Sequence, residues 1–274
     1  MEKGILYLVA TPIGNLEDIT LRAIKVLKEV DLIAAEDTRQ TLKLLNHLEI
    51  SKPLISYHRH NEEVRKEILI EKLLNGQNVA VVTDAGTPAI SDPGEEIVKE
   101  AIENEIKIVP IPGACALINA LIASGLDTKE FSFYAFLPLN KKLRKNKLEE
   151  IKKDGKTAIL YEAPHKLMST LDDILKNLGD RYIVLAKELT KIHESFLRGN
   201  VSEILVNLEK NPPKGEYIIL IKGERIVEEN ELNKLSLEEH YEFYKNQGLE
   251  KKEIIKKIAK DRNVSKNEIY QKFI

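Results

Sequence analysis

The chain has 274 residues, of which 43% are hydrophobic and 31% charged, and its formal net charge at pH 7 is −2. This composition is typical of a globular protein, and the length is more typical of two domains than of one. A nearly neutral chain excludes a global polyanion-binding surface, so any contact with nucleic acid must come from local patches. The single cysteine, Cys115, excludes an internal disulfide, and the first residues lack the features of a signal peptide. We therefore expect a cytoplasmic protein without a membrane segment, since no stretch approaches the roughly 18 apolar residues of a membrane helix.

The N-terminal part alternates short apolar runs with amphipathic patterns. The strands that these runs predict cover residues 5–10, 32–36, 53–58, 78–84 and 106–111. The helices between them are expected to follow Asp18 and Thr20, to cover 38–48 and 61–74, and to begin again near Pro93. Nearly continuous Val/Ile runs are typical of strands that are buried on both faces. The pattern therefore predicts a mostly parallel sheet with helical crossovers, closed near residue 115.

A second alternating set follows. Its predicted strands cover residues 131–137, 157–163, 181–189, 194–199 and 216–223, and its helices roughly 143–153, 165–178 and 201–209. These strands are longer, and the short spacing between the third and the fourth favours a hairpin. We therefore expect a mixed sheet here.

After residue 232 the strand signals disappear and three helical patterns remain. They cover 237–247, 251–262 and 266–274, and they are separated by Gly248-Leu249 and Asn263-Val264-Ser265. Helices joined by short turns, with a basic middle helix, are typical of a helix-turn-helix module. The sequence thus predicts an α/β protein in three parts, at residues 1–115, 116–226 and 232–274.

Polar and glycine-containing loops follow the strands of the first predicted sheet. The carboxyl ends of parallel strands meet at one edge, so these loops are expected to converge around a small molecule, with a carboxylate and a histidine available. Gly113 and the small residues after it would let backbone N–H groups approach such a ligand closely. Each loop taken alone also has an ordinary interpretation as a turn or helix cap. The loops are residues 11–15, 36–39, 56–62, 84–94 and 110–114.

Several common active-site patterns are absent. The sequence has no G-x-G-x-x-G dinucleotide fingerprint, no G-x-x-x-x-G-K-[ST] phosphate loop and no G-x-S-x-G elbow. His58 and His60 form an H-x-H pair, but no Cys/His/Asp set stands at zinc-binding spacing, so we expect no resident metal. A weakly held Mg²⁺ on Glu36, Asp37 or Glu62 stays open.

Eight segments occur in an order that resembles one protein family. They are LVATPIGNLEDIT, AEDTR, SYHRHNE, VTDAGTPAISDPG, PGACA, FSFYAFLP, YEAPHKL and KELTKIHE. Over about residues 5–222 the chain is similar to the ribosomal RNA small subunit methyltransferase I family, a branch of the tetrapyrrole (corrin/porphyrin) methylase superfamily. The resemblance implies two α/β domains of the tetrapyrrole methylase type, with S-adenosylmethionine in the cleft between them, and a homodimer. It also implies methylation of the ribose 2′-hydroxyl of a cytidine in the decoding region of 16S ribosomal RNA, in the small ribosomal subunit.

The same resemblance suggests the residues that hold the cofactor. In the superfamily the loop after the fourth strand usually reads G-D-P, whereas this chain has Gly86-Thr87-Pro88, as the RNA-modifying branch does, which leaves Asp84 as a substitute aspartate. Cys115 stands where a serine is common and is expected to act through its backbone N–H. With Gly113, the expected cofactor-binding residues are Pro12, Asp84, Gly86, Thr87, Ala89, Ile90, Cys115, Ala116, Tyr161, Glu162, Ala163, Tyr217 and Ile218.

Methyl transfer to a ribose hydroxyl benefits from a group that accepts the hydroxyl proton, typically by about 10²–10⁴-fold. We expect this catalytic group in the polar loops or in the second sheet, and we expect Arg39 to clamp a phosphate or carboxylate with its forked guanidinium. An equally good interpretation is that several of these side chains only brace the cleft through ion pairs. The candidates are Glu36, Asp37, Arg39, His58, Glu62, Glu162, His165, Lys187, Glu188, Lys191 and Glu194.

Two basic segments are candidates for contact with RNA. A run of like charges is usually a solvated helix face, but two such segments on a nearly neutral chain favour RNA binding. The candidates are Lys141, Lys142, Arg144, Lys145, Lys251, Lys252, Lys256 and Lys257.

Two other functions stay open at this point. The first is a methyltransferase of the same fold that acts on a tetrapyrrole precursor, which the basic C-terminal module and the Thr87 loop disfavour. The second is a non-catalytic RNA-binding assembly factor, which the intact set of cleft loops disfavours.

Overall fold

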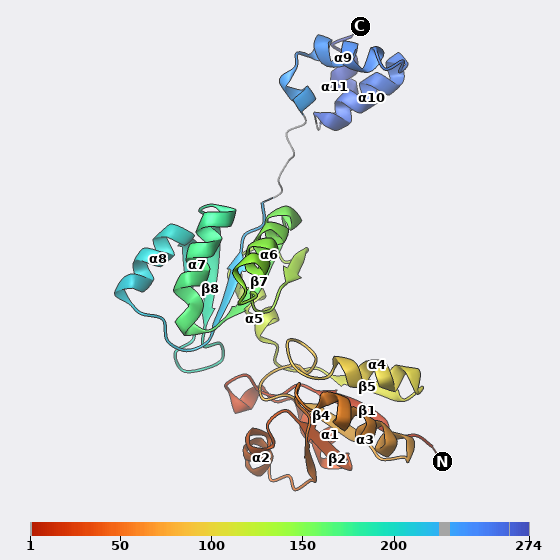
Figure 1. Ribbon diagram of the computed structural model, residues 1–274, viewed down its shortest axis with the longest axis vertical. Coiled ribbons are helices and arrows are strands. Elements are labelled where there is room, and N and C mark those ends of the chain that lie inside the picture. The colour runs from red at the N-terminus through yellow and green to blue at the C-terminus, as the bar shows by residue number, and fades with distance from the viewer. Residues whose placement is uncertain (1, 225–230, 263, 274) are drawn as a thin grey trace. The chain divides into compact units, whose positions relative to one another are not determined.

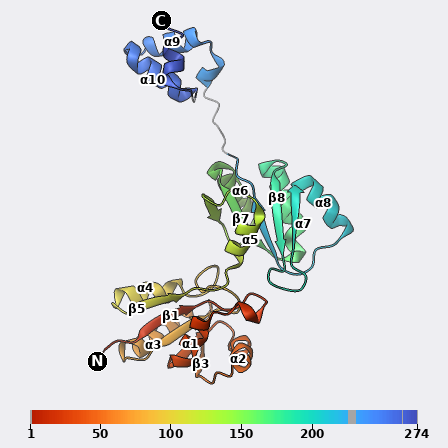
Figure 2. The same cartoon turned by 180° about the vertical axis from the view of Figure 1, so that it is seen from behind.

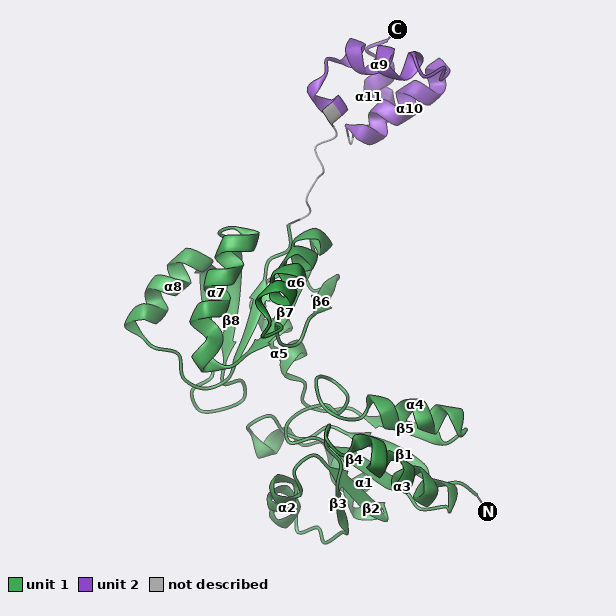
Figure 3. Cartoon of the chain, in the orientation of Figure 1, with its two compact units in different colours: residues 1–224 green, residues 225–274 purple. Residues whose placement is uncertain are grey.

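The chain folds into two compact units, residues 1–224 and 225–274, which Figure 3 shows in different colours. The computed structural model describes residues 2–224, 231–262 and 264–273. The expected boundary at residue 226, the turn residue Asn263 and the last residue, Ile274, lie outside the described residues. The three domains drawn from the sequence, 1–115, 116–226 and 232–274, stay predictions.

The first sheet is fully parallel, as the sequence predicts. Its strand order is β3-β2-β4-β1-β5, so β1 lies between β4 and β5 while β3 and β2 lie on the far side of β4. Every residue of β2 and β4 is buried, which explains their unbroken apolar sequences. The strands are β1 (Ile5–Val9), β2 (Leu32–Ala35), β3 (Leu54–Ser56), β4 (Val79–Val82) and β5 (Lys107–Ile111).

Helices cover both faces of this sheet. Leu27 of α1 and Leu45 of α2 pack on one face, and Leu69 of α3 and Ile97 of α4 pack on the other. Two of the four α-helix starts are capped by side chains, since Thr20 accepts from the Ala23 N–H and Asp37 from the Arg39 N–H. The elements are η1 (Leu16–Asp18), α1 (Leu21–Glu29), α2 (Thr38–His47), α3 (Glu62–Leu74) and α4 (Glu95–Glu103).

The second sheet is mixed, as the hairpin-like spacing predicts. Its order is β6-β7-β10-β8-β9, in which only the β6–β7 pair is parallel. The strand expected over residues 131–137 ends at Phe133, because Ala135 has φ +52° and its carbonyl accepts from the Tyr161 N–H. The strands are β6 (Phe131–Phe133), β7 (Thr157–Glu162), β8 (Tyr182–Lys187), β9 (Ser195–Asn200) and β10 (Tyr217–Ile221).

The second sheet is also covered on both faces (Figures 1 and 2). Leu117 and Leu121 of α5 pack with Val184 and Leu220 on one face. The helices α6, α7 and α8 supply the apolar side chains of the opposite face. They are α5 (Ala116–Ser124), α6 (Lys141–Asp154), α7 (Pro164–Leu178) and α8 (Val201–Lys210).

The C-terminal unit is a small helical bundle with its own apolar core, centred on Ile254, Ile258 and Ile269. His240 is fully buried beside Asp261 and accepts at Nδ1 from the Arg262 side chain. Its elements are η2 (Glu231–Lys234), α9 (Leu237–Lys245), α10 (Lys251–Asp261) and α11 (Lys266–Tyr270). Across the described residues of both units, no helix is long and apolar enough to span a bilayer.

A methyl group at position 113 should destabilise the first domain. An added Cβ on Gly113 would lie 2.8 Å from the Ala10 Cβ, much closer than van der Waals contact. We expect Gly113→Ala to lower the free energy of unfolding by about 1–3 kcal/mol in urea denaturation. The double variant Gly113→Ala with Ala10→Gly removes the clash, so the two changes should be coupled favourably. Strict additivity of the two effects would contradict this explanation.

Candidate functional site

The loops after β1, β2, β4 and β5 are joined by hydrogen bonds at the carboxyl edge of the first sheet. Thr11 and Gly86 exchange backbone hydrogen bonds of 2.8 and 3.1 Å, and the Thr87 hydroxyl donates to the Ala114 carbonyl at 3.1 Å. On the other side the Asp37 N–H donates to the Asp84 carboxylate at 3.0 Å. The expected convergence of the polar loops on one edge is therefore confirmed.

The loop of residues 84–94 has a strongly constrained backbone. Ala89 and Ser91 have φ values of +66° and +67°, which residues with a Cβ seldom adopt. Gly86 has φ +94°, and a Cβ there would lie 3.2 Å from Ile13. The Glu62 carboxylate accepts from the Gly94 N–H at 3.1 Å and fixes the far end of the loop. These contacts hold an unfavourable backbone in one conformation.

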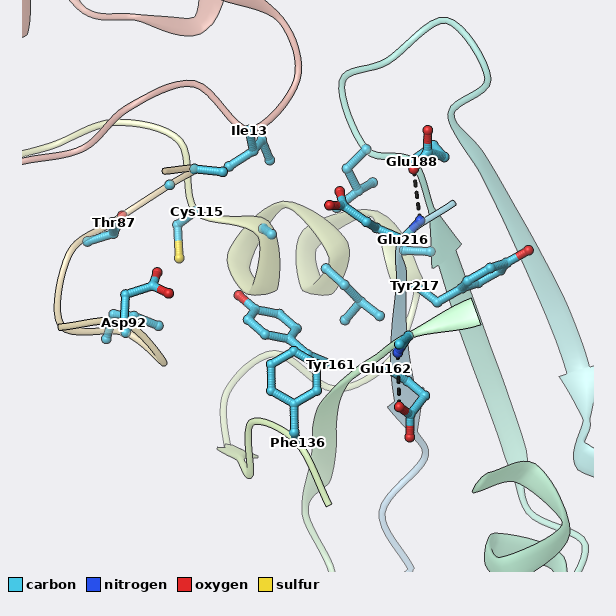
Figure 4. A pocket seen from close by; sticks show the side chains of 18 of the residues that line it. Ile13, Thr87, Asp92, Cys115, Phe136, Tyr161, Glu162, Glu188, Glu216 and Tyr217 are labelled. Atoms are coloured by element: carbon cyan, nitrogen blue, oxygen red, sulfur yellow. Dashed lines mark hydrogen bonds between the residues drawn. The ribbon is translucent and has the colours of Figure 1, made fainter. Parts of the chain in front are cut away.

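This loop forms one wall of a cavity of about 420 Å³, whose other wall is the second sheet. We call it the interdomain cavity (Figure 4). The loops of the two domains also touch directly, since Gly14 lies against Lys191 and Thr190. Of the residues expected to bind a cofactor, the structure brings together Gly86, Thr87, Ile90, Cys115, Ala116, Tyr161, Glu162, Ala163, Tyr217 and Ile218.

Four expected cofactor residues are not part of the cavity lining. Asp84 points toward the β2 loop, where it accepts from the Asp37 N–H. Ala89 packs against Gly94, and Gly113 against Ala10. Pro12 precedes Ile13, which does line the cavity. The role of Gly113 that the structure supports is close packing of the β5 loop on β1.

Eight lining residues were not singled out by the sequence reasoning. The signals that could have found some of them were present: Asp92 belongs to the SDPG segment, Phe136 to FSFYAFLP, and Ala186 to the strand expected over residues 181–189. Four of the others also belong to the segments that carry the resemblance, whereas the charged Glu216, directly before β10, belongs to none of them. The eight are Ile13, Ala85, Asp92, Phe136, Pro164, Ala186, Leu189 and Glu216.

The catalytic candidates of the β2 and β3 loops do not line the cavity. Glu36 accepts from the Thr83 hydroxyl at 2.7 Å. Arg39 donates to both carboxylate oxygens of Asp37 at 3.0 and 2.7 Å, and this hydrogen bonding lowers the pKa of Asp37 to about 2. The physical reason is the strand order, because β3 and β2 lie beyond β4 whereas β4, β1 and β5 supply the loops of the cavity wall.

Two candidates from the β3 loop are held inside the first domain. Glu62 accepts a hydrogen bond of 2.8 Å from the buried Tyr57 hydroxyl, and burial together with this carboxylate raises the pKa of Tyr57. His58 lies beside His60 with ring centroids 6.0 Å apart, and its Nδ1 is buried without a hydrogen-bond partner. These contacts fit the interpretation of the loop residues as braces.

Among the second-sheet candidates, Glu162 and Glu188 line the cavity. Glu162 is buried and accepts from the Ala163 N–H at 2.9 Å and from the Thr170 hydroxyl. Glu188 accepts from the Glu216 N–H at 2.8 Å and from the Lys191 ammonium at 3.0 Å, and the backbone donor is the main reason that its pKa is lowered. His165, Glu194 and Lys187 are not part of the lining, although Glu194 accepts from the Thr190 N–H at 2.6 Å.

The most perturbed carboxyl group of the cavity is Asp92. Burial raises its pKa from 3.8 to about 6, and the nearby negative charge of Glu36 adds to the effect. Tyr161 extends its hydroxyl toward the same region as Cys115 and Asp92 in Figure 4, and burial raises the pKa of that phenol too. Phe133 and Phe136 contact the Tyr161 ring edge-to-face, with centroids 5.0 and 5.7 Å away. The cavity therefore has an aromatic wall and a carboxyl group whose pKa is raised by burial.

The basic side chains expected to bind RNA differ in their exposure to solvent and in whether they already contact other groups of the protein. Arg144 is only 12% exposed and donates to Asp173 at 2.6 Å and to Thr170 at 2.7 Å, so it braces α6 on α7. Lys251 donates to the Phe273 carbonyl at 2.9 Å, and Lys257 lies 4.9 Å from the centre of the Tyr244 ring. The side chains of Lys141, Lys142, Lys145, Lys252 and Lys256 are exposed at the surface.

No group of three or more His, Cys, Asp or Glu side chains in the described part of the chain is arranged to hold a metal ion.

The sequence model of the tetrapyrrole (corrin/porphyrin) methylases matches residues 5–205 of the chain. The chain belongs to the tetrapyrrole methylase family. The fold agrees with this membership: the chain resembles a uroporphyrin-III C-methyltransferase from Thermus thermophilus with a TM-score of 0.53 at 20% identity, over 80% of this chain and 92% of that one. A cobalt precorrin-4 methyltransferase resembles it with a TM-score of 0.60 at 18% identity, over 80% of this chain and 94% of the other.

Much more similar relatives of this methylase carry the name ribosomal RNA small subunit methyltransferase I. The protein of that name from Halalkalibacterium halodurans is 52% identical over 98% of this chain and 94% of its own length. The one from Bacillus subtilis is 50% identical over 99% of this chain and 94% of its own. The one from Synechocystis is 46% identical over 98% and 96%. The resemblance seen in the sequence segments is therefore confirmed.

The raised pKa of Asp92 predicts a pH-dependent stability. The folded methylase binds this proton more tightly than the unfolded chain, so the contribution is favourable below the ordinary pKa of 3.8 and is lost as the pH rises toward about 6. Asp92→Asn should therefore raise the free energy of unfolding at pH about 8 by roughly 1 kcal/mol after solvent screening, and much less near pH 4. The Tm should rise relative to the parent protein in the same way. Thermal unfolding across this range measures the difference.

The matched control for this comparison is Asp172→Asn, on the exposed side of α7. It should leave the pH profile of Tm unchanged. If Asp92→Asn shifted Tm equally at both ends of the range, burial of the charge would not be the cause.

Proposed function

We propose that this methylase transfers the methyl group of S-adenosylmethionine to the ribose 2′-hydroxyl of a cytidine in the decoding region of 16S ribosomal RNA. The observation that carries the proposal is the near full-length similarity, at 46–52% identity, to relatives named for methylation of small-subunit ribosomal RNA. The RNA class comes from those names. The position and the 2′-oxygen come from the resemblance of the segments, as do the homodimer and the cytoplasmic setting.

The residues of the interdomain cavity fit a cofactor of this kind. A cavity of about 420 Å³ is within the usual range for small-molecule sites, and its lining combines apolar and aromatic side chains with a few carboxylates. Tyr161, Phe136 and Ile218 offer an apolar surface to an adenine ring. Asp92, Glu188 and Glu216 would give a negative field that favours a cationic ligand. When bound, the sulfonium would supply an electrophilic methyl group.

The acceptor hydroxyl must lose its proton as the methyl group is transferred. Asp92 is the carboxyl group of the cavity whose pKa, about 6, is best matched to accepting a proton near neutral pH. Glu188 is a poorer candidate, since its lowered pKa reflects a carboxylate already engaged by Lys191 and the Glu216 N–H. We therefore assign the proton to Asp92 and a positioning role to Glu188. Tyr161 and Phe136 would help to exclude water.

The two solved tetrapyrrole methyltransferases support the fold alone, at 18–20% identity. They do not favour a tetrapyrrole substrate over RNA. A non-catalytic assembly factor would need no cofactor, so binding of S-adenosylmethionine by calorimetry separates that function from the proposed one.

Filling the cavity should abolish methyl transfer. Ala116 lines the cavity at the start of α5, and Ala116→Leu would place a larger side chain in the space proposed for the cofactor. We expect this variant to lose detectable binding of S-adenosylmethionine in calorimetry and to lose transfer of radiolabelled methyl to small ribosomal subunits. Mapping of the modified sugar in the parent reaction then identifies the nucleotide.

Ala123→Leu is the matched control, because it makes the same change on the exposed side of the same helix. It should keep both cofactor binding and turnover. If Ala116→Leu kept full activity, the interdomain cavity would not be the cofactor site. If the parent protein had no affinity for S-adenosylmethionine, the proposed function would be wrong.

The lysines of α10 in the C-terminal unit should add electrostatic affinity for RNA. Deleting residues 232–274 removes the lysines of α10, so binding to small ribosomal subunits should weaken and depend less steeply on salt. Filter binding over a range of salt concentrations measures the slope, with binding of S-adenosylmethionine as a check on the fold of the remainder. An unchanged slope would exclude this unit as an RNA contact.

A further inference from the structure

A second cavity, of about 490 Å³, lies on the α8 side of the second sheet. It is formed by the ends of β8, β9 and β10 together with the C-terminal end of α8 and the residues that follow it. Three lysines line it, Lys187, Lys210 and Lys214, with hydrogen-bonding side chains at Ser195, Asn207 and Asn211. We call it the lysine cavity.

Strand alternation separates the two cavities. Ala186 and Ile218 are register partners and line the interdomain cavity, whereas the next pair, Lys187 and Tyr217, faces the opposite side of the sheet. Tyr217 lines both cavities, and in Figure 4 its ring points away from Cys115 and Asp92. The lysine cavity therefore lies directly behind the floor of the proposed methyl-transfer site.

The charge in the lysine cavity is unbalanced. Its lining contains no Asp or Glu. No ion pair or side-chain hydrogen bond joins the ammonium groups of Lys187, Lys210 and Lys214 to any residue in the described part of the chain. The neighbouring carboxylates of Glu188 and Glu216 are both held by Lys191, at 3.0 and 2.8 Å.

Of the three lysines, Lys187 acts on a neighbouring carboxylate, that of Glu188, whose pKa it helps to lower. Three lysines around one hollow whose lining has no carboxylate, on a chain of net charge −2, favour an anionic ligand. Lysine ammonium groups bind phosphate oxygens as point charges, and amide and hydroxyl groups add hydrogen bonds of fixed direction. A polynucleotide that presents one nucleotide to the interdomain cavity carries further phosphates on either side of it. Those phosphates need cationic partners close to, but outside, the reaction site.

We propose that the lysine cavity binds a phosphodiester group of the RNA substrate, a few nucleotides away from the one that is methylated. This inference rests on the proposed function, since it takes ribosomal RNA as the substrate. It adds a binding surface on the body of the methylase, distinct from the basic segments at 141–145 and 251–257.

The test replaces the two exposed lysines, Lys210→Gln with Lys214→Gln, in the full-length protein. The probe is a small ribosomal subunit or a fragment of its RNA, and affinity is measured by filter binding at several salt concentrations. We expect affinity to fall several-fold and the slope of log K against log salt to become shallower by up to about 2, as for the loss of two phosphate contacts. Affinity for S-adenosylmethionine should stay the same, which also shows that the variant is folded.

The matched control is Lys129→Gln with Lys176→Gln, which removes two exposed lysines of the same domain that line neither cavity. Equal slopes for the two double variants would overturn the inference while leaving the proposed function intact. Binding of inorganic phosphate at millimolar concentration, lost in Lys210→Gln/Lys214→Gln without any change in RNA affinity, would also overturn it and would assign the cavity to a small free anion. A parent protein that binds no ribosomal RNA would instead count against the proposed function.

Discussion

The backbone pairing of Thr11 with Gly86 is the constraint on which the interdomain cavity depends. Two N–H···O=C bonds join the loop after β1 to the loop after β4, and Thr87 then reaches the Ala114 carbonyl in the loop after β5. Three loops from three neighbouring strands are thereby fixed as one surface. The positive φ angles of Ala89 and Ser91 lie between this pairing and the contact of Glu62 with the Gly94 N–H, and a strained backbone persists only where its surroundings over-determine it.

The strand order decides which polar groups can do chemistry. Because β1 lies between β4 and β5, the loops after these three strands face the second domain. The loops after β2 and β3 do not line the interdomain cavity, and their polar groups bind other residues of the first domain. Arg39 neutralises Asp37, and Glu62 joins Tyr57 to Gly94. These ion pairs and hydrogen bonds hold the loops of the first domain in place without lining the interdomain cavity. The groups left facing the cavity are few, and Asp92 is the one whose ionisation is most strongly altered by burial.

Much of this organisation could be predicted from the sequence, and the failures have physical causes. Periodicity predicts both sheets and their helices, because a buried parallel strand and an amphipathic helix each leave a repeating apolar pattern. The apolar pattern does not reveal the order of the strands in a sheet. The sequence alone therefore could not show that Glu36 and His58 lie away from the interdomain cavity. Arg144 was an RNA candidate by charge alone, yet its partner Asp173 lies on a different helix and only the packing of α6 on α7 reveals the pair. Asp92 belongs to the segment VTDAGTPAISDPG, but burial is what raises its pKa, and burial cannot be read from a local sequence pattern.

Helix α5 begins at Ala116, directly after the loop that closes the edge of the first sheet, yet its apolar side packs on the second sheet. Cys115 and Ala116 thus belong to a short stretch whose two ends are anchored in separate cores. A molecule wedged against that stretch would resist any twisting of one domain against the other. Together with the contact of Gly14 with Lys191 and Thr190, a bound molecule would accordingly add to the torsional stiffness of the N-terminal unit.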